Sequence, residues 1–184
     1  HSYHNPIGLD GLQAHGQCRA LAQATGGVVL PPFYVGTDTI KPYKGFPHSI
    51  EHAASTVRAL CREVLAQLAD EAFRVVVIVT GHCGEDHVDA LRAEVDMFTE
   101  RQDAVGALLI PAFDPMKDTY APNHAAWGET SLQLLFDPEP VDLTRLPADR
   151  VATLDEDGVW GDDPRSASAE DGAAILKLFV ARTA

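Results

Sequence analysis

The feature that most constrains the fold is an unbroken run of β-branched residues, Val75-Val-Val-Ile-Val79, which follows Arg74. Such an apolar run, bounded by turn residues, is typical of a parallel strand that is covered on both faces. We therefore predict a strand over 74–79 at the centre of a sheet. It ends in the turn Thr80-Gly-His-Cys-Gly84, which places His82 where open α/β sheets bind their ligands.

Helical and strand-like segments alternate along the rest of the chain. Apolar spacing predicts helices over 12–24, 50–72, 86–101, 129–136 and 169–182, and short apolar runs predict strands over 28–30 and 107–110. Turn residues predict a long loop over 31–47 and a surface loop or hairpin over 155–164. This alternation predicts a layered α/β fold with a mainly parallel central sheet flanked by helices. We expect a single domain, because no linker or repeat divides residues 1–184.

Composition argues against nucleic-acid and membrane partners. The formal net charge is -13, whereas nucleic-acid affinity depends on clustered Lys and Arg, of which the chain has 14 in scattered positions. No apolar run approaches the roughly 20 residues of a membrane span, and no charged-then-apolar leader is found. Cys18, Cys61 and Cys83 lack the paired spacing of a disulfide framework or a zinc knuckle. We therefore expect a cytoplasmic protein with reduced thiols.

Three short segments carry the side chains best suited to chemistry. They are His1-Ser-Tyr-His4-Asn-Pro-Ile-Gly8-Leu-Asp10, Gly81-His82-Cys83-Gly84-Glu85 and His124-Ala-Ala-Trp127-Gly-Glu129-Thr-Ser131. Each places imidazole or carboxylate groups beside turn-forming residues, which is a common way to build a hydrolytic metal centre. Structural alternatives stay open, because Asp10 also suits a helix cap and Glu129 also suits a solvated helix N-terminus.

Two further residues of these segments have competing interpretations. Cys83 precedes a predicted helix, whose dipole lowers a thiol pKa, so it is either a nucleophile of a thiol-dependent amidase or a small packing residue. Trp127 is either a lid over a substrate or a core aromatic. The other aromatic candidates for lining a pocket are Tyr34, Tyr43, Phe46 and Tyr120.

Taken in order, these segments resemble the creatininase family, also called creatinine amidohydrolases. The family's E-x-H-G-P-H-L-P-x-G-T-D, N-G-H-G-G-N and H-A-G-x-x-E-T-S motifs are similar to the first, second and third segments. Further similar pieces are Leu30-Pro-Pro, Lys44-Gly-Phe-Pro47 and the stretch from Gly158 to Gly172. The resemblance covers nearly the whole chain. It implies a three-layer creatininase-like fold and a ring-like homo-oligomer, often a hexamer.

The resemblance also implies a site for two divalent metal ions, which zinc, manganese or iron(II) would suit. The implied metal ligands are His1, Asp10, His82 and Glu129, with Asp10 bridging the two ions. His124 and Glu129 are the implied catalytic residues, and Cys83, Glu85 and Trp127 would contact the substrate. The implied reaction is hydrolysis of a non-peptide C–N bond in a small, cyclic amide by a water that bridges the metals.

The chain departs from the family pattern at two ligand positions. The family's first metal ligand, a glutamate two residues before the position of His1, is not in the sequence, and we expect that the natural N-terminal strand that carries it is missing. Creatininase itself has another acidic ligand at the position of Gly84, and Glu85 stands one place later. The alternative function is therefore a non-catalytic, creatininase-like binding or structural subunit.

Overall fold

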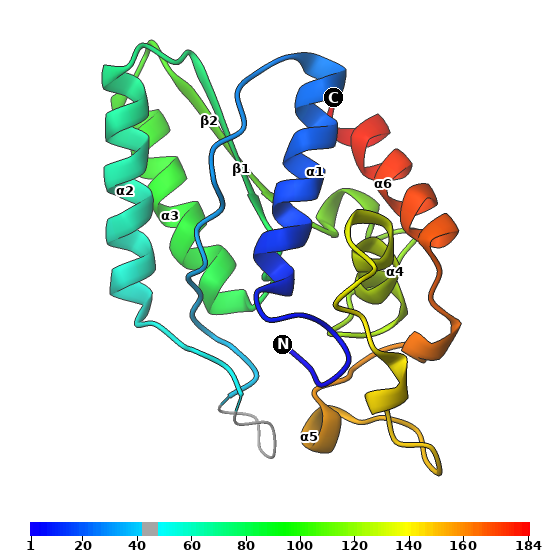
Figure 1. Ribbon diagram of the computed structural model, residues 1–184. Helices are drawn as coiled ribbons and strands as arrows, with labels where there is room; N and C mark the ends of the chain where they lie inside the picture. The colour runs from blue at the N-terminus through cyan, green and yellow to red at the C-terminus, as the bar shows by residue number, and fades with distance from the viewer. Residues whose placement is uncertain (42–47) are drawn as a thin grey trace.

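A small parallel sheet lies between two groups of helices in the computed structural model, which describes residues 1–41 and 48–184 (Figure 1). In the described residues the sheet has two strands, β1 (Val75–Thr80) and β2 (Gly106–Pro111). They pair from Val75 opposite Gly106 to Thr80 opposite Pro111. Both strands were expected from their apolar runs, and their parallel pairing confirms the α/β class.

Two helices cover one face of the sheet, α2 (Ala54–Asp70) and α3 (Glu85–Arg101). Apolar side chains of α2, spaced one helical turn apart, pack with those of α3 and of the strands in one cluster, which includes Val57, Cys61, Leu65, Val76, Leu91 and Ala107. An ion pair also joins the helices, because the partly exposed Arg58 donates to the buried Glu94 over 2.7 Å. The helix predicted from residue 50 begins only at Ala54.

Three helices lie against the opposite face, α1 (Leu9–Thr25), α4 (Trp127–Phe136) and α6 (Ala169–Thr183). Alternate strand residues point to this side, so Val79 and Ile110 pack with Leu132 of α4 and Phe179 of α6. Helices α4 and α6 approach so closely that a Cβ on Gly172 would lie 2.1 Å from a backbone oxygen of α4. The fold therefore has the three layers that were predicted.

The segment after α4 folds back over the start of that helix. It contains the short helix α5 (Leu154–Asp157) and two single 3-10 turns, Leu143–Arg145 and Pro164–Ser166; another such turn, Asp114–Met116, follows β2. Where a surface loop or hairpin was expected over 155–164, the chain instead ends α5 and makes an antiparallel bridge between Trp160 and His124. None of the helices in the described part of the chain combines the length and apolar character needed to cross a membrane.

Two expectations about the sheet are wrong for the described residues. Val28–Leu30 forms no strand, and β1 has β2 on one side and no described strand on the other, so it is not central. A strand needs a neighbour to satisfy its backbone groups, and an apolar run alone does not supply one. Val28 and Val75 are accordingly 72% and 63% exposed.

A long apolar groove runs beside the unpaired edge of β1. Its volume is about 1450 Å³, and its walls are α1, α2, β1 and residues 26–36. Figure 1 shows the segment that follows α1 running back between α1 and α2. The groove reaches His1, Asp10 and His82 at the carboxyl end of β1.

Candidate metal centre

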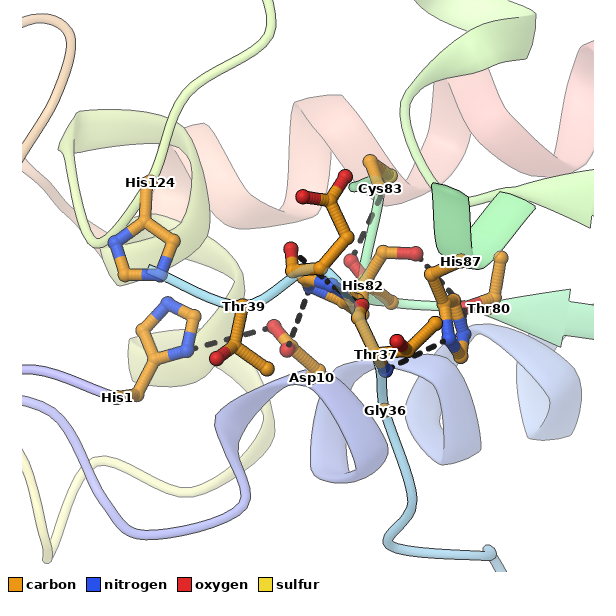
Figure 2. Close-up of polar contacts among 12 residues, drawn as sticks. His1, Asp10, Gly36, Thr37, Thr39, Thr80, His82, Cys83, His87 and His124 are labelled. Atoms are coloured by element: carbon orange, nitrogen blue, oxygen red, sulfur yellow. Dashed lines mark hydrogen bonds and ion pairs between the residues drawn. The ribbon is translucent and has the colours of Figure 1, made fainter. Parts of the chain in front are cut away.

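Four side chains from separate parts of the chain meet near the carboxyl end of β1. His1 precedes α1 and Asp10 lies in its first turn, while His82 follows β1 and Glu129 lies in the first turn of α4. Single ligand atoms of His1, Asp10 and Glu129 lie within 4.8 Å of one another, and Nδ1 of His82 lies 3.6 Å from Oδ2 of Asp10. Figure 2 shows Asp10 between the imidazoles of His1 and His82.

Hydrogen bonds fix which nitrogen of His82 faces Asp10. Nε2 lies 2.9 Å from the carbonyl oxygen of Thr37 and 3.1 Å from that of Asp38. Because carbonyl oxygens only accept, Nε2 carries the proton and Nδ1 of the neutral ring keeps its lone pair. That lone pair faces a carboxylate oxygen, which is also an acceptor. Two acceptors that face each other in this way are suited to share a cation.

Both ring nitrogens of His1 face carboxylates. Nε2 lies 3.0 Å from Oε2 of Glu129, and Nδ1 lies 3.5 Å from Oδ1 of Asp10. Burial lowers the pKa of His1, but the negative charges of Asp10 and Glu129 outweigh it and raise the pKa to about 9. Two imidazoles and two carboxylates fit zinc, manganese or iron(II), which accept mixed nitrogen and oxygen ligands.

Uptake of zinc should therefore displace a proton from His1. The pKa of about 9 in the folded protein lies above the ordinary 6.5, so in metal-free protein the stabilisation by protonated His1 is complete below about pH 6.5 and is lost as the pH rises towards 9. At about pH 8, zinc should release about one proton more from the native protein than from His1→Asn, as measured with an indicator dye in dilute buffer. Equal release from both proteins would contradict this assignment.

The carboxylate of Glu129 is held in place by the turn before α4. Its side chain is buried, and the Ala125 N–H donates to Oε2 over 2.6 Å. Ala125 adopts a φ of +52°, a left-handed conformation that costs a non-glycine residue roughly 1–2 kcal/mol. The Gln13 side chain of α1 also donates to the Glu129 backbone oxygen over 2.6 Å. The strained conformation of Ala125 therefore directs its N–H at the carboxylate of Glu129.

His124 lies next to the four-residue cluster as a neutral imidazole. Its ring stacks on that of His1 with 4.0 Å between the centroids. Figure 2 shows the two rings next to each other. Nδ1 lies 2.7 Å from the Gly158 carbonyl oxygen, so Nδ1 donates and Nε2 keeps the lone pair. Burial, followed by the positive charge of His1, lowers the pKa of His124 to about 4. His124 is therefore neutral near pH 7 and has a free lone pair on Nε2.

A half-buried ion pair between Arg150 and Asp157 holds the loop that contacts His124. The carboxylate of Asp157 accepts two N–H bonds from Arg150, over 2.6 and 3.1 Å, and the backbone N–H of Thr153 over 2.8 Å. Gly158 follows directly and adopts a left-handed conformation. The backbones of His124 and Trp160 exchange two hydrogen bonds of 2.8 Å. The sequence pattern of Asp and Gly indicated a loop here but not this contact with the site.

The residues expected to contact substrate differ in their surroundings. Glu85 is exposed at the start of α3. Cys83 reaches solvent, but desolvation by the surrounding protein and the negative charge of Glu129 raise the pKa of its thiol to about 12. A thiol of that pKa stays protonated near neutral pH, which disfavours the nucleophile interpretation.

The aromatic candidates are also dispersed. The Trp127 ring lies 5.9 Å from that of Tyr120 and packs against the apolar cluster around Leu132, as a core aromatic would. The ring of Tyr34 covers the N-terminal turn of α1 at Gly8 and borders the groove. The other two candidates, Tyr43 and Phe46, and the Lys44–Pro47 motif lie outside the described residues.

His4 belongs to a separate polar network, although its spacing from His1 made it a candidate for the same point. It is 1% exposed, and Nε2 lies 3.2 Å from the Thr130 hydroxyl and 3.2 Å from the Asn5 amide nitrogen. Burial is the main cause that lowers its pKa to about 4. His4 thus joins the N-terminal segment to α4 as a neutral, hydrogen-bonded core residue. Sequence spacing could not separate it from His1.

Comparisons with known proteins identify the family and the fold of this chain. A family model described as creatinine amidohydrolase matches residues 1–184. The creatinine amidohydrolase of Pseudomonas putida is 24% identical over an alignment of 213 positions, gaps included, which covers 98% of this chain and 81% of that protein. Two solved creatininase structures, a mutant of Zn–Zn type and a manganese form, have TM-scores of 0.81 and 0.82 at 21% and 20% identity, and each match covers 98% of this chain and 82% of theirs. This chain belongs to the creatininase family.

Proposed function

We propose that this protein is a metal-dependent amidohydrolase that cleaves a non-peptide C–N bond in a small, cyclic amide. The observation that carries the proposal is the convergence of His1, Asp10, His82 and Glu129, with His124 stacked beside them. Membership of the creatininase family supports the hydrolytic chemistry. The zinc and manganese forms of two structural neighbours support divalent ions as the cofactors.

The proposed metal ligands divide around Asp10. Its Oδ1 lies 3.5 Å from His1 and its Oδ2 lies 3.6 Å from His82, so one carboxylate faces both imidazoles. We assign His1, Asp10 and Glu129 to one ion, and Asp10 and His82 to the other. Divalent ions held in this way supply Lewis acidity, which polarises a carbonyl group and lowers the pKa of water.

His124 is the residue best placed to move a proton. Its Nδ1 is committed to Gly158, so Nε2 is the atom that accepts a proton and later returns it to the departing nitrogen. In the metal-free protein the carboxylates of Asp10 and Glu129 raise the pKa of His124, but burial and the positive charge of His1 outweigh them. Proton acceptance at Nε2 of His124 therefore depends on the hydrogen bond that Nδ1 donates to the Gly158 carbonyl oxygen.

Metal content and hydrolysis together test the proposal. Protein purified without chelator should contain about two divalent ions per chain and should hydrolyse at least one member of a panel of cyclic amides, formamides and sugar- or peptide-derived amides. Loss of turnover on treatment with a chelator, restored by zinc or manganese, would support metal dependence. Absence of both metal and turnover would favour the non-catalytic subunit instead, for which Gly84 at a family ligand position is the supporting observation.

His124→Asn should separate catalysis from metal binding. Asparagine keeps a donor for the Gly158 carbonyl but lacks an atom in place of Nε2, so turnover should fall by about 10²–10⁴-fold while metal content stays native. Asp118→Asn is a suitable control, because it breaks an exposed ion pair with Arg182 on α6. Unchanged turnover in His124→Asn would remove this residue from the mechanism.

We also propose that residues 1–184 form one hydrolase domain that is completed by a strand in the apolar groove. The unpaired edge of β1 offers backbone groups, and Val75 and Val77 are 63% and 38% exposed there. A parallel strand on this edge would end beside His1 and Asp10, where another carboxylate could join the metal ligands.

A longer form of the protein tests the strand. A chain carrying the natural residues that precede His1 should melt at a higher temperature and bind metal more tightly than residues 1–184. A form with the same added residues in scrambled order controls for length. If natural and scrambled forms behave alike, the groove does not hold such a strand.

A further inference from the structure

A closed circuit of hydrogen bonds lies behind His82 and includes a second histidine, His87, of α3. Figure 2 shows the two rings side by side, with Thr37 and Thr80 beside them. The ring centroids are 4.9 Å apart. His87, Thr80 and Thr37 are only 3%, 7% and 8% exposed, so water does not compete for these bonds.

The direction of every bond in the circuit follows from the groups involved. The Thr80 hydroxyl donates to the His82 carbonyl oxygen over 2.9 Å, which uses its only hydrogen. Thr80 must therefore accept from Nε2 of His87, 3.1 Å away. Nδ1 of His87 then has a lone pair, and it accepts the Thr37 N–H over 3.5 Å.

The circuit closes at the ring of His82. The same Thr37 whose N–H is held by His87 offers its carbonyl oxygen to Nε2–H of His82 over 2.9 Å. His87 thus holds two of the groups that fix His82, the Thr37 backbone that faces its ring and, through Thr80, the backbone carbonyl of His82 itself. The third group, the Asp38 carbonyl oxygen at 3.1 Å from Nε2, belongs to the residue that follows Thr37. As a result Nδ1 of His82 is the nitrogen that faces Asp10.

We propose that His87 is a positioning residue for metal binding, which holds the ring of His82 in one orientation and one tautomer with Nδ1 directed at Asp10. The inference rests on the proposed metal site, in which His82 is a ligand. His87 itself is not among the residues whose ligand atoms meet in the cluster of His1, Asp10 and Glu129. It acts through His82, as groups that orient metal ligands from behind commonly do.

Zinc titration of three variants tests the assignment. His87→Phe keeps a ring of similar shape but removes both hydrogen bonds, whereas His87→Gln keeps one donor and one acceptor. His52→Phe is the matched control, because His52 accepts the N–H of the adjacent Gly36 over 3.5 Å without contacting His82. Zinc affinity is measured by competition with a zinc indicator. His87→Phe should lower the affinity of the weaker of the two zinc sites by about 10–100-fold, whereas the affinities of His87→Gln and His52→Phe should stay within about threefold of the native value.

Nuclear magnetic resonance of the histidine rings in metal-free protein supplies a second readout. The native protein should show His82 as the Nε2–H tautomer, and His87→Phe should show a mixture of tautomers. Thr80→Val breaks the same circuit at another point and serves if His87→Phe does not fold. It should weaken zinc binding in the same direction.

Two outcomes would overturn the inference. One is native zinc affinity in both His87→Phe and Thr80→Val. The other is equal weakening by His87→Phe, His87→Gln and His52→Phe in step with their melting temperatures, which would mean a general loss of stability. Neither result depends on hydrolysis, so a native protein that binds zinc but cleaves no amide would refute the proposed function and leave the role of His87 standing.

Discussion

Asp10→Ala is expected to abolish metal-dependent turnover, with a fall of at least about a thousandfold and a metal content below one ion per chain. The Asp10 carboxylate is the group that faces both His1 and His82, at 3.5 and 3.6 Å. Its removal leaves the lone pair of His82 Nδ1 without the oxygen that would complete a shared cation site. Elemental analysis and turnover measured on the same preparation would test both effects.

Asp10 contributes to stability as an acid in the first turn of α1, an effect of about 0.3–1 kcal/mol, and through its charge beside His1. The variant should stay folded, because His1 keeps its hydrogen bond to Glu129. Glu170→Ala is the matched control, since Glu170 is an acid in the first turn of α6. The control should lose a similar amount of stability and keep its metal. Native metal content and turnover in Asp10→Ala would refute the proposed mechanism.

The sequence predicted the layers of the fold because they depend on local patterns. The β-branched run of β1 and the helical spacing of α2 and α3 each report burial within a single element. The position of His82 at a ligand-binding edge was predictable as well, since the carboxyl ends of parallel strands collect ligands. That Asp10 lies beside it was implied by the resemblance to the creatininase family. Val28–Leu30 was expected to form a strand because it is apolar. A strand also needs a neighbouring backbone to pair with, and a local pattern does not show whether one is present.

The finer features of the site depend on contacts that no periodicity records. His1 and His4 looked alike in sequence, and only their partners separate a carboxylate-facing imidazole from one bonded to Thr130. Position 125 has a left-handed backbone conformation, which a glycine there would have indicated, but the residue is alanine. No feature of the sequence singles out His87, because the sequence does not show that Thr37 lies beside it.

Gly81→Ala is expected to abolish metal binding, although Gly81 is not itself a ligand. A Cβ at this position would lie 2.1 Å from the carbonyl oxygen of Asp10 and 2.8 Å from its Cα. Backbone atoms at these distances cannot rotate away, so the first turn of α1 and the turn before His82 must separate. The free energy of unfolding should fall by about 1–3 kcal/mol, and turnover should be lost with the metal.

Gly106→Ala separates this close contact from the general cost of replacing a strand-end glycine. At Gly106 the nearest atom to a new Cβ would be the Arg74 carbonyl oxygen, 4.0 Å away, so metal content and turnover should stay native. Gly81 is not among the described glycines with positive φ, so the turn conformation does not require it. Glycine is required at position 81 because α1 lies so close to this turn, which brings Asp10 next to His82. A metal-replete, active Gly81→Ala would show that the site tolerates displacement of this helix.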